Sequence, residues 1–496
     1  MTGAARPTYP RRTIWFCDTD KVASHPEWLA RLRDEIGLTT LMAEDFTHHT
    51  SGFAASPEVA ARGPLSDWPN RRELLDLHLG AERAARGVYP VVPGILGGVD
   101  DSNMRALLDA AERAGIEVWG HIGLWSYAGE LFPEFSMRDV WGNPPDLAFQ
   151  RWGIGFCPSK HVVNDWVAEG LADVTRRYPV AGFMVDHARY PAPASVSAMF
   201  GCACPDCAAE GRRLGYDVDA IYSAVRDLPA RLASLTPSRL RRAADASASF
   251  VDWLSWMGGA SNEIVAWLEL RCRLLAERMA QFRSVVQQTR AAAPALHPAA
   301  ARSPECVWGS DVFPPSISIF GGHDYALWQQ GADYLTGGSS HGGVVGWATA
   351  VTFLAWEWGR WLCTQVPGLD EDTALRLLYR LLGYDDLITG VGEALAAGKD
   401  ATASAAGAPD KLPLTFAPLE RGDVPVVAIM EREVARLAAG APAGLALYPP
   451  IAAGRAHDQL AALCGVVRHA AVDGALISGL DATNPAQLRT IRQHLG

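Results

Sequence analysis

Short hydrophobic runs recur along this chain and are separated by amphipathic segments. Each run is brief and is followed by polar or turn-forming residues, which is typical of a buried strand. The runs are residues 13–18, 39–43, 115–121, 180–185, 295–301, 333–336, 443–448 and 473–479. The segments between them, such as 26–36 and 103–114, repeat apolar residues every three or four positions, the spacing of one helix face. The pattern therefore predicts eight strands that alternate with helices.

Such alternation, with polar residues placed after the strands, indicates a parallel α/β fold. Eight units predict a (β/α)8 TIM barrel that forms a single domain over residues 1–496. A typical barrel has about 250 residues, so this chain requires long loops and helical insertions. Residues 208–290 predict a helical insertion, and the helical pattern from about 216 to 293 is expected to include the fourth barrel helix as well. Residues 398–413, rich in Ala, Ser, Gly and Pro, predict a surface linker. A doubly wound sheet with a second domain is the alternative.

Composition narrows the classes of partner. The chain has 496 residues, of which 49% are hydrophobic, and it can bury a large core. A net charge of −11 argues against nucleic acid as the main partner, because phosphate binding requires a basic face. No apolar run reaches the length of a membrane span, and residues 1–12 lack the apolar core of a secretory signal. We therefore expect a cytoplasmic protein whose nine cysteines are reduced.

Three of these cysteines form a tight cluster, Cys202-x-Cys204-x-x-Cys207. Zinc prefers four soft ligands in a tetrahedron, and Cys157 is the best candidate for the fourth. It lies in the loop after the third strand, which neighbours the loop after the fourth strand in a parallel barrel. Four thiolates close the coordination sphere, so we expect a structural Zn²⁺, with three merely packed thiols as the alternative. The remaining five are expected to be packed hydrophobes: Cys17, Cys272, Cys306, Cys363 and Cys464.

The fourth strand ends in a cluster of polar and aromatic residues. Asp186, His187, Arg189 and Tyr190 follow the apolar run directly. Ligands of parallel sheets sit at the carboxyl ends of the strands, so Asp186 is a candidate for catalysis. The alternative is a structural role, in which Asp186 caps a turn and pairs with Arg189.

Several segments resemble bacterial (β/α)8 glycoside hydrolases and glycosidase-like barrel proteins. They are residues 156–159, 182–191, 200–207, 310–316 and 322–325. The arrangement of one plus three cysteines is similar to the zinc cluster of family 42 β-galactosidases. The resemblance implies a barrel with a carbohydrate or glycoside substrate, a bound zinc ion and possible homo-oligomers. Family 42 enzymes carry an Asn-Glu pair at the fourth strand, where this chain has Asp186-His187, and residues 443–450 supply no Glu for a nucleophile.

Glycoside hydrolysis needs two carboxyl groups, one protonated and one ionised. We expect Asp186 to be one of them and Asp311 or Glu305 to be its partner. The apolar neighbours Val312 and Phe313 favour a raised pKa at Asp311, whereas the alternative is that Asp311 caps a turn before Pro314. Residues expected to line the mouth of the barrel and bind a sugar are Asp18, Glu44, His121, Trp125, His187, Arg189, Tyr190, His323 and Asp324.

Two other functions remain open at this point. A metal-dependent hydrolase is disfavoured because the first strand carries Cys17-Asp18-Thr19-Asp20 where a His-x-His motif is expected. A non-catalytic carbohydrate-binding barrel protein is compatible with the missing Glu pair. Turnover, with and without a chelator, separates these functions from a glycosidase.

Overall fold

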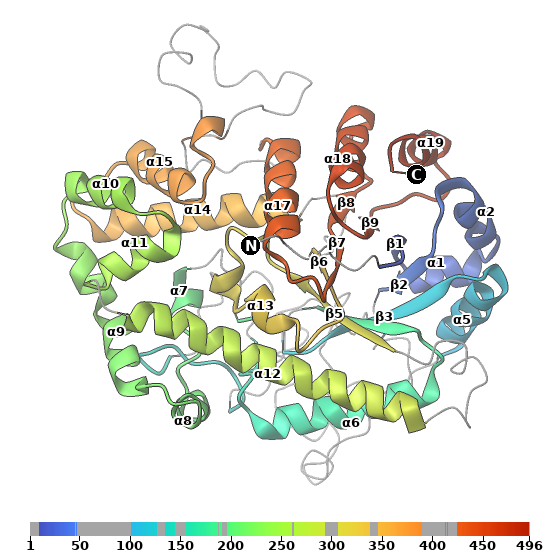
Figure 1. Ribbon diagram of the computed structural model, residues 1–496, viewed down its shortest axis with the longest axis horizontal. Coiled ribbons are helices and arrows are strands. Elements are labelled where there is room, and N and C mark those ends of the chain that lie inside the picture. Colours follow the sequence, from blue (N-terminus) through green and yellow to red (C-terminus); the bar gives the residue numbers. More distant parts are fainter. Residues whose placement is uncertain are drawn as a thin grey trace, which may run out of the picture.

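The computed structural model (Figure 1) describes most of the chain. The described residues are 9–44, 46, 101–125, 134–143, 155–186, 188–190, 196–259, 262–292, 306–337, 346–388, 412, 414 and 424–495. The sequence pattern also predicts a long loop at 46–69 and a helix at 71–86, and both lie wholly or largely outside the described residues. The same holds for the predicted strand at 295–301, the predicted linker at 398–413, and the site residues His187 and Glu305.

The described strands form one sheet in which every neighbouring pair is parallel. They are β1 (Arg12–Cys17), β2 (Thr40–Ala43), β3 (Glu117–Gly123), β4 (Gly182–Asp186), β5 (Val307–Val312), β6 (Tyr334–Gly337), β7 (Ala446–Tyr448), β8 (Pro450–Ala452) and β9 (Gly474–Ser478). Their order in the sheet is β7-β6-β5-β4-β3-β2-β1-β9-β8. The sequence prediction of a parallel α/β fold is confirmed.

The two ends of this sheet meet and close a barrel. β7 pairs with β6 and β8 pairs with β9, yet β7 and β8 are consecutive pieces of chain separated only by Pro449. β7 and β8 therefore occupy one strand position of the barrel between them, and the nine strands fill eight positions. A proline lacks the N–H needed for a ladder, which explains the interruption. The pattern predicts a strand over 443–448 that stops before Pro449 and Pro450, whereas Pro450 begins β8.

Inward-facing side chains fill the barrel. They form a separate hydrophobic cluster that includes Ile14, Phe16, Met42, Trp119, Met184, Tyr334, Ala446, Tyr448 and Leu476. The rings of Trp119 and Tyr334 stack with centroids 4.4 Å apart. The interior is thus a packed core rather than a pore, as in other barrels of eight strands.

Helices surround the barrel, and Figure 1 shows them around its outside. They are α2 (Glu27–Ile36), α5 (Ser102–Ala114), α6 (His161–Arg177), α12 (Glu263–Ala292), α17 (Val426–Gly440), α18 (His457–His469) and α19 (Pro485–His494). In α2, Leu29, Leu32 and Ile36 are buried on one face, and the helix ends at Gly37 with φ of 68°. That left-handed conformation is favourable for glycine and stops the helix. None of the helices in the described ranges is long and apolar enough to cross a membrane.

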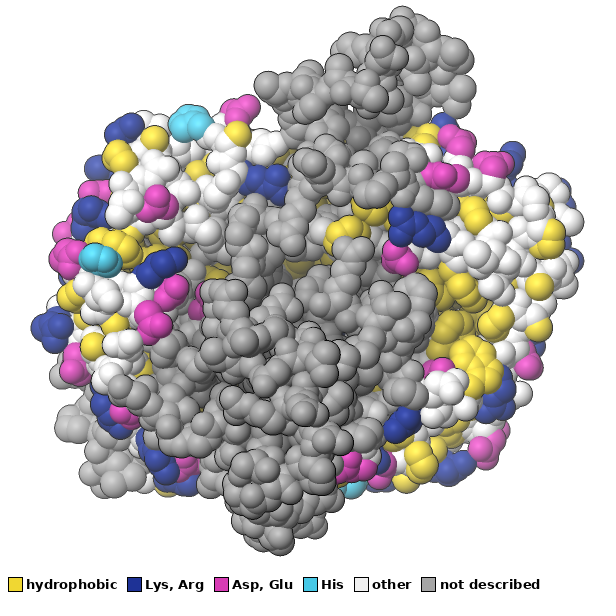
Figure 2. All heavy atoms as spheres, turned by 180° about the vertical axis from the view of Figure 1, so that it is seen from behind, with side chains coloured by type: hydrophobic (Ala, Val, Ile, Leu, Met, Phe, Trp, Pro, Cys, Tyr) yellow, Lys and Arg dark blue, Asp and Glu magenta, His cyan; other side chains and the backbone are white. Residues whose placement is uncertain are grey.

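Two helical insertions meet on one side of the barrel, at the left of Figure 1. The first lies between β4 and α12 and comprises α7 (Val196–Met199), α8 (Pro205–Arg213), α9 (Val218–Ala233), α10 (Pro237–Ala246) and α11 (Phe250–Met257). The second follows β6 and comprises α14 (Gly346–Gln365) and α15 (Glu371–Leu381). Aromatic contacts join them, for example Phe250 to Trp358 at 5.2 Å between ring centroids. Figure 2 shows hydrophobic side chains at the surface on this side, which lies at the right in that view.

The helical stretch around 208–290 contains both parts that the sequence predicts there, an insertion and the barrel helix that follows β4. α7 to α11 form the insertion, whereas α12 packs beside α6 and supplies the barrel helix that follows β4. Helical periodicity alone could not separate them because both parts are buried on one or more faces.

The fifth strand also differs from the prediction. The strand that pairs with β4 and β6 is β5, at Val307–Val312, and not residues 295–301. Gly309, Ser310 and Asp311 interrupt its apolar pattern and hide the strand in the sequence. A Cβ on Gly309 would lie 2.5 Å from the ring of Tyr334, so a bulky ring inside the barrel explains the glycine. Asp311 consequently lies within a strand and does not cap a turn.

Candidate functional site

Asp186 is the last residue of β4 and faces the inside of the barrel. Side chains alternate along a strand, so Asp186 shares the inner face with Met184, a member of the interior cluster. His121 of β3 shares the same face with Trp119. Its Nε2 lies 3.3 Å from Oδ2 of Asp186, and the two side chains are 11% and 21% exposed. The ring of Phe16 meets the His121 ring edge-on at 5.1 Å. A carboxylate and an imidazole therefore adjoin at the carboxyl end of the inner wall.

Asp311 lies directly beside Asp186 on the neighbouring strand. Val185 pairs with Ser310, so the next residues, Asp186 and Asp311, stand opposite each other. Asp311 also shares its face with Gly309, which abuts the Tyr334 ring inside the barrel. Neighbouring strands are about 4.8 Å apart, so both carboxylates project inward at one level of the wall. The two predicted carboxylates are thus brought together, and His121 is at their side.

His323 is buried next to the loops that follow these two strands, and both of its ring nitrogens form hydrogen bonds within the protein. It is only 2% exposed. Phe313 N–H donates to Nδ1 at 3.0 Å, and Nε2–H donates to the carbonyl of Ala188 at 2.9 Å. The ring stacks on Phe313 and meets Trp328 edge-on. No ring nitrogen remains to bind a sugar, so the expected sugar contact does not fit this geometry.

Burial lowers the pKa of His323 from its ordinary 6.5 to about 3. The unfolded chain binds a proton at this histidine below pH 6.5, whereas the folded protein does not until about pH 3. We therefore expect the contribution of His323 to stability to be fully present above pH 6.5 and to fall between pH 6.5 and 3. His323→Gln should lack this dependence, which amounts to about 1.4 kcal/mol per pH unit. Urea unfolding of both proteins at several pH values in this window measures the difference, and parallel curves would contradict it.

Several other predicted sugar-binding residues have structural roles instead. Trp125 is 1% exposed, and its Nε1–H donates to Asn164 at 3.1 Å. Tyr190 is fully buried beneath the guanidinium of Arg271, whose Cζ is 4.5 Å from the ring centroid. Burial removes both aromatic rings from the reach of a ligand, although each follows a barrel strand as predicted.

Charged residues from the same predicted set are used as caps and contacts. Asp18 accepts the N–H of Lys21 and caps α1 (Thr19–Ser24), and Asp324 accepts two N–H groups at the start of α13 (Tyr325–Trp328). Arg189 lies over the ring of Phe313, with Cζ 5.5 Å from the centroid. Glu44 directly follows β2, where its N–H donates to Cys17 O. Among the residues of this set that the structure describes, His121 lies 3.3 Å from Asp186.

A buried glutamate that the sequence did not single out supports the loop after β5. Glu433 of α17 is fully buried and accepts the N–H of Ser316 at 2.9 Å. The hydroxyl of Tyr384 and the guanidinium of Arg436 also donate to it. A Glu among the apolar positions of an amphipathic helix was the available signal. Its bonds hold the segment that follows Asp311.

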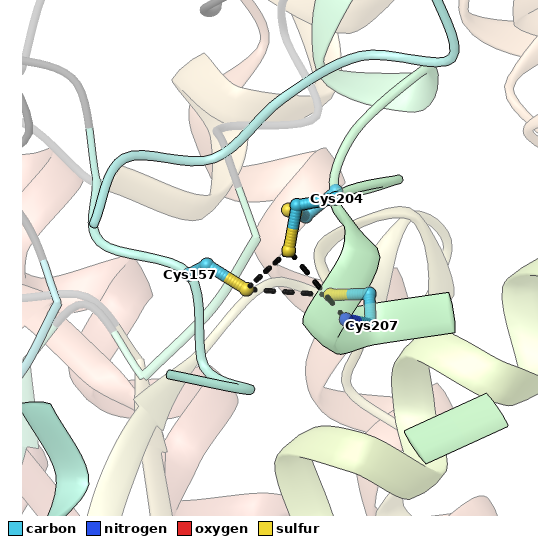
Figure 3. Close-up of side chains that lie close together, drawn as sticks. Cys157, Cys204 and Cys207 are labelled. Carbon is cyan, nitrogen blue, oxygen red and sulfur yellow. Dashed lines mark hydrogen bonds between the residues drawn. The ribbon is translucent and has the colours of Figure 1, made fainter. Parts of the chain in front are cut away.

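The four predicted cysteines come together as one buried cluster. Their sulfur atoms all lie within 4.8 Å of one another. Cys204 and Cys207 lie at the start of α8, and Cys157 approaches from the loop before α6 (Figure 3). The Cys157 sulfur is 3.4 Å from that of Cys204 and 3.3 Å from that of Cys207. Residues 47 and 50 positions apart thus meet through the adjacent loops after β3 and β4, as the barrel prediction requires.

Backbone groups already point at these sulfur atoms. The N–H of Ser159 donates to Cys157 at 3.3 Å, that of Arg138 to Cys202 at 3.4 Å, and that of Cys207 to Cys204 at 3.5 Å. Such donors favour thiolates, the form that binds metal. Of the other cysteines, Cys17, Cys272, Cys306 and Cys464 are buried as expected, and Cys363 is partly buried.

The thiols also perturb one another. Burial raises the pKa of Cys157, and hydrogen bonding with Cys157 raises the pKa of Cys207. The same interactions lower the pKa of Cys204. Without a cation, the buried cluster does not favour four negative charges. With a divalent cation, four thiolates become favourable, so the cluster can hold a metal ion.

Comparisons with known proteins place the fold. No protein-family model and no curated protein matches the chain. Among solved structures, the catalytic domain of β-amylase from Paenibacillus polymyxa is 8% identical and matches 99% of each chain with a TM-score of 0.50. The fold is a (β/α)8 barrel, like that of this β-amylase domain. The resemblance seen in the sequence motifs is therefore confirmed at the level of the fold.

Two further solved structures are similar to this barrel. The glycoside hydrolase domain of PgaB (BpsB) from Bordetella bronchiseptica is 12% identical, and the match covers 76% of this chain and 92% of that chain with a TM-score of 0.38. A β-galactosidase from the psychrophilic Marinomonas ef1 is 11% identical, with 66% and 40% covered and a TM-score of 0.34. The present chain thus spans less than half of that β-galactosidase.

Proposed function

We propose that this barrel is a glycoside hydrolase in which Asp186 and Asp311 are the two catalytic carboxyl groups. The supporting observation is their register: they stand opposite each other on β4 and β5 and share the inner face at the carboxyl ends of the strands. Active sites of such barrels lie at this end. His121 adds a ring nitrogen 3.3 Å from the Asp186 carboxylate at the same end of the inner wall.

The roles follow from the surroundings. Asp186, beside His121, acts as the nucleophile on the anomeric carbon, while Asp311 donates its proton to the leaving oxygen. Asp311 then takes a proton from water, and that water releases the sugar from Asp186. Carboxyl groups about 5–5.5 Å apart are typical of retaining enzymes. Adjacent strands place the backbones of the two residues about 4.8 Å apart, which is compatible with this shorter separation, and we propose that the anomeric configuration is retained.

A panel of aryl glycosides tests this function. The wild-type protein is expected to release the phenol from at least one α- or β-linked sugar, and a chelator should not stop the initial rate of protein that is still folded. Loss of turnover before any unfolding would indicate a metal-dependent hydrolase. Sugar binding without turnover across the panel would indicate a non-catalytic carbohydrate-binding protein.

We also propose that the cysteine cluster holds a structural zinc ion. The proposal is supported by four sulfur ligands in a buried cage, which is the ligand set of closed zinc sites. Cys157, Cys202, Cys204 and Cys207 would bind the ion and join the loops after β3 and β4. A closed site leaves no position for water, so the metal braces the barrel mouth and takes no part in bond cleavage.

Elemental analysis provides the direct measurement of this site. We expect one zinc per chain in protein prepared without chelators, because the cluster offers a single tetrahedral set of ligands. A Cys157→Ser variant should lose that zinc, whereas Cys272→Ser, a buried cysteine outside the cluster, should keep it. Metal-free wild-type protein would contradict the proposal.

A further inference from the structure

Two hydrogen bonds of His323 join the loops that follow β4 and β5, the strands that carry Asp186 and Asp311. The residue two positions after Asp186 is Ala188, and the residue two positions after Asp311 is Phe313. His323 bonds to the backbone of both: it accepts the N–H of Phe313 at 3.0 Å and donates to the carbonyl of Ala188 at 2.9 Å. The side chain of His323 therefore joins the two strand ends through these two hydrogen bonds, which we call the bridge.

The ring of His323 is held in one orientation by its surroundings. Phe313 stacks on one side at 5.6 Å between centroids, and Trp328, which is fully buried, meets it edge-on at 5.0 Å. Its own N–H donates to Ser318 O at 3.0 Å. The preceding Gly322 has φ of 87°, and a Cβ there would lie 2.9 Å from the ring of Tyr190. The turn that presents His323 is therefore closely packed against the loop after β4.

A backbone hydrogen bond also joins the same two loops. The N–H of Tyr190 donates to the carbonyl of Gly321 at 2.9 Å, and the Arg189 guanidinium lies over the Phe313 ring. The loop after β4 is thus attached to the segment 313–323 at both Ala188 and Tyr190. His323 is the member of this set that contacts both loops through its side chain.

We propose that His323 is a positioning residue that fixes the separation of Asp186 and Asp311 by joining the backbones just beyond them. The inference rests on the proposed glycosidase function of these two carboxyl groups. It replaces the expected sugar contact with a role inside the wall of the barrel. The reason is geometric: a two-carboxylate mechanism depends on the distance between the groups, and a misplacement of about 1 Å can cost roughly 100-fold in rate.

Three substitutions separate the two bonds of the bridge. His323→Asn keeps an acceptor near Nδ1 for the Phe313 N–H, His323→Gln keeps a donor near Nε2 for Ala188 O, and His323→Leu keeps neither. Amide hydrogen exchange at Phe313 measures the hydrogen bond from the Phe313 N–H to His323 Nδ1, and it needs no substrate. We expect exchange there to accelerate about 10-fold or more in His323→Leu and to stay near the wild-type rate in His323→Asn.

Steady-state turnover measures how loss of the bridge affects the candidate active site. In His323→Leu we expect kcat on an aryl glycoside to fall about 10- to 100-fold with little change in KM, and the Asn and Gln variants to recover part of it. Tyr379→Phe serves as the control, since it removes one buried bond, from Trp356 Nε1 at 2.9 Å, between α14 and α15. It should lower stability and leave both exchange at Phe313 and kcat unchanged.

Hydrogen exchange and turnover together test the bridge separately from the proposed glycosidase function. Wild-type exchange at Phe313 in His323→Leu would overturn the bridge. So would an unchanged kcat in His323→Leu when Asp186→Asn is inactive, because the separation of the pair would then not depend on His323. If Asp186→Asn instead keeps full turnover, the proposed function fails, and so does a positioning role for His323 in it. Should His323→Leu not fold, the comparison of His323→Asn with His323→Gln gives the same test.

Discussion

Replacing Asp186 with Asn is expected to lower turnover by about 100-fold or more, the scale of a positioned acid, base or nucleophile. The substitution keeps the shape of the side chain and removes the charge that, in the proposed mechanism, attacks the anomeric carbon. The melting temperature should change little, because Asp186 is at the end of β4 with its side chain 21% exposed and is not in the packed interior. Steady-state kinetics and thermal unfolding of the same variant measure both quantities.

Two further variants sharpen this result. Asp219→Asn removes an exposed carboxylate that pairs with Arg212, and it should change neither turnover nor stability appreciably. Asp311→Asn removes the proposed acid and base, so azide, a nucleophile that needs no base, should restore turnover of an aryl glycoside with a good leaving group. An active but destabilised Asp186→Asn protein would indicate a structural Asp186 and would leave Asp311 and Glu305 as the groups to test.

The second large effect is expected at the cysteine cluster. Cys204→Ser should lower the free energy of unfolding by more than about 3 kcal/mol, because a metal bound only by the folded state contributes its binding energy to folding. Zinc content should fall with it, while kcat of the folded fraction stays near that of the wild type. Denaturant unfolding with and without added zinc measures the loss.

A matched control is available for this prediction. Cys464 is also fully buried, lies on α18 and takes no part in the cluster. Cys464→Ser should cost only what is expected of a hydroxyl in an apolar site, about 1–3 kcal/mol, with no change in zinc content. Equal losses in the two variants, both insensitive to zinc, would contradict a metal site.

The sequence predicted the fold where local patterns carry the information. Apolar runs revealed most of the strands because their side chains are buried on both faces of the parallel sheet. β5 was misplaced because Gly309 and Asp311 occupy its inner face, one to accommodate Tyr334 and one at the site. The helical pattern predicted an insertion and a fourth barrel helix, but the boundary between α11 and α12 depends on tertiary packing that periodicity does not encode.

The candidate site was predictable only in part. Cys202, Cys204 and Cys207 share one turn, so their spacing alone suggested a metal cluster. Position after a strand brought Asp186 to notice, but it could not tell a mouth residue from a buried one such as His323. Burial arises from segments far apart in the chain, and the bonds of His323 to residues 188 and 313 appear only once the loops are packed.

The most direct measurement of the central claim is a crystal structure with a broad-specificity iminosugar bound. The protonated ring nitrogen of such an inhibitor resembles the charge of the transition state and seeks a pair of carboxylates. The account predicts that this nitrogen binds between Asp186 and Asp311, with His121 beside it, and that Asp186→Asn weakens its binding. An inhibitor bound at the barrel mouth away from both carboxylates, with unchanged affinity in Asp186→Asn, would contradict the assignment.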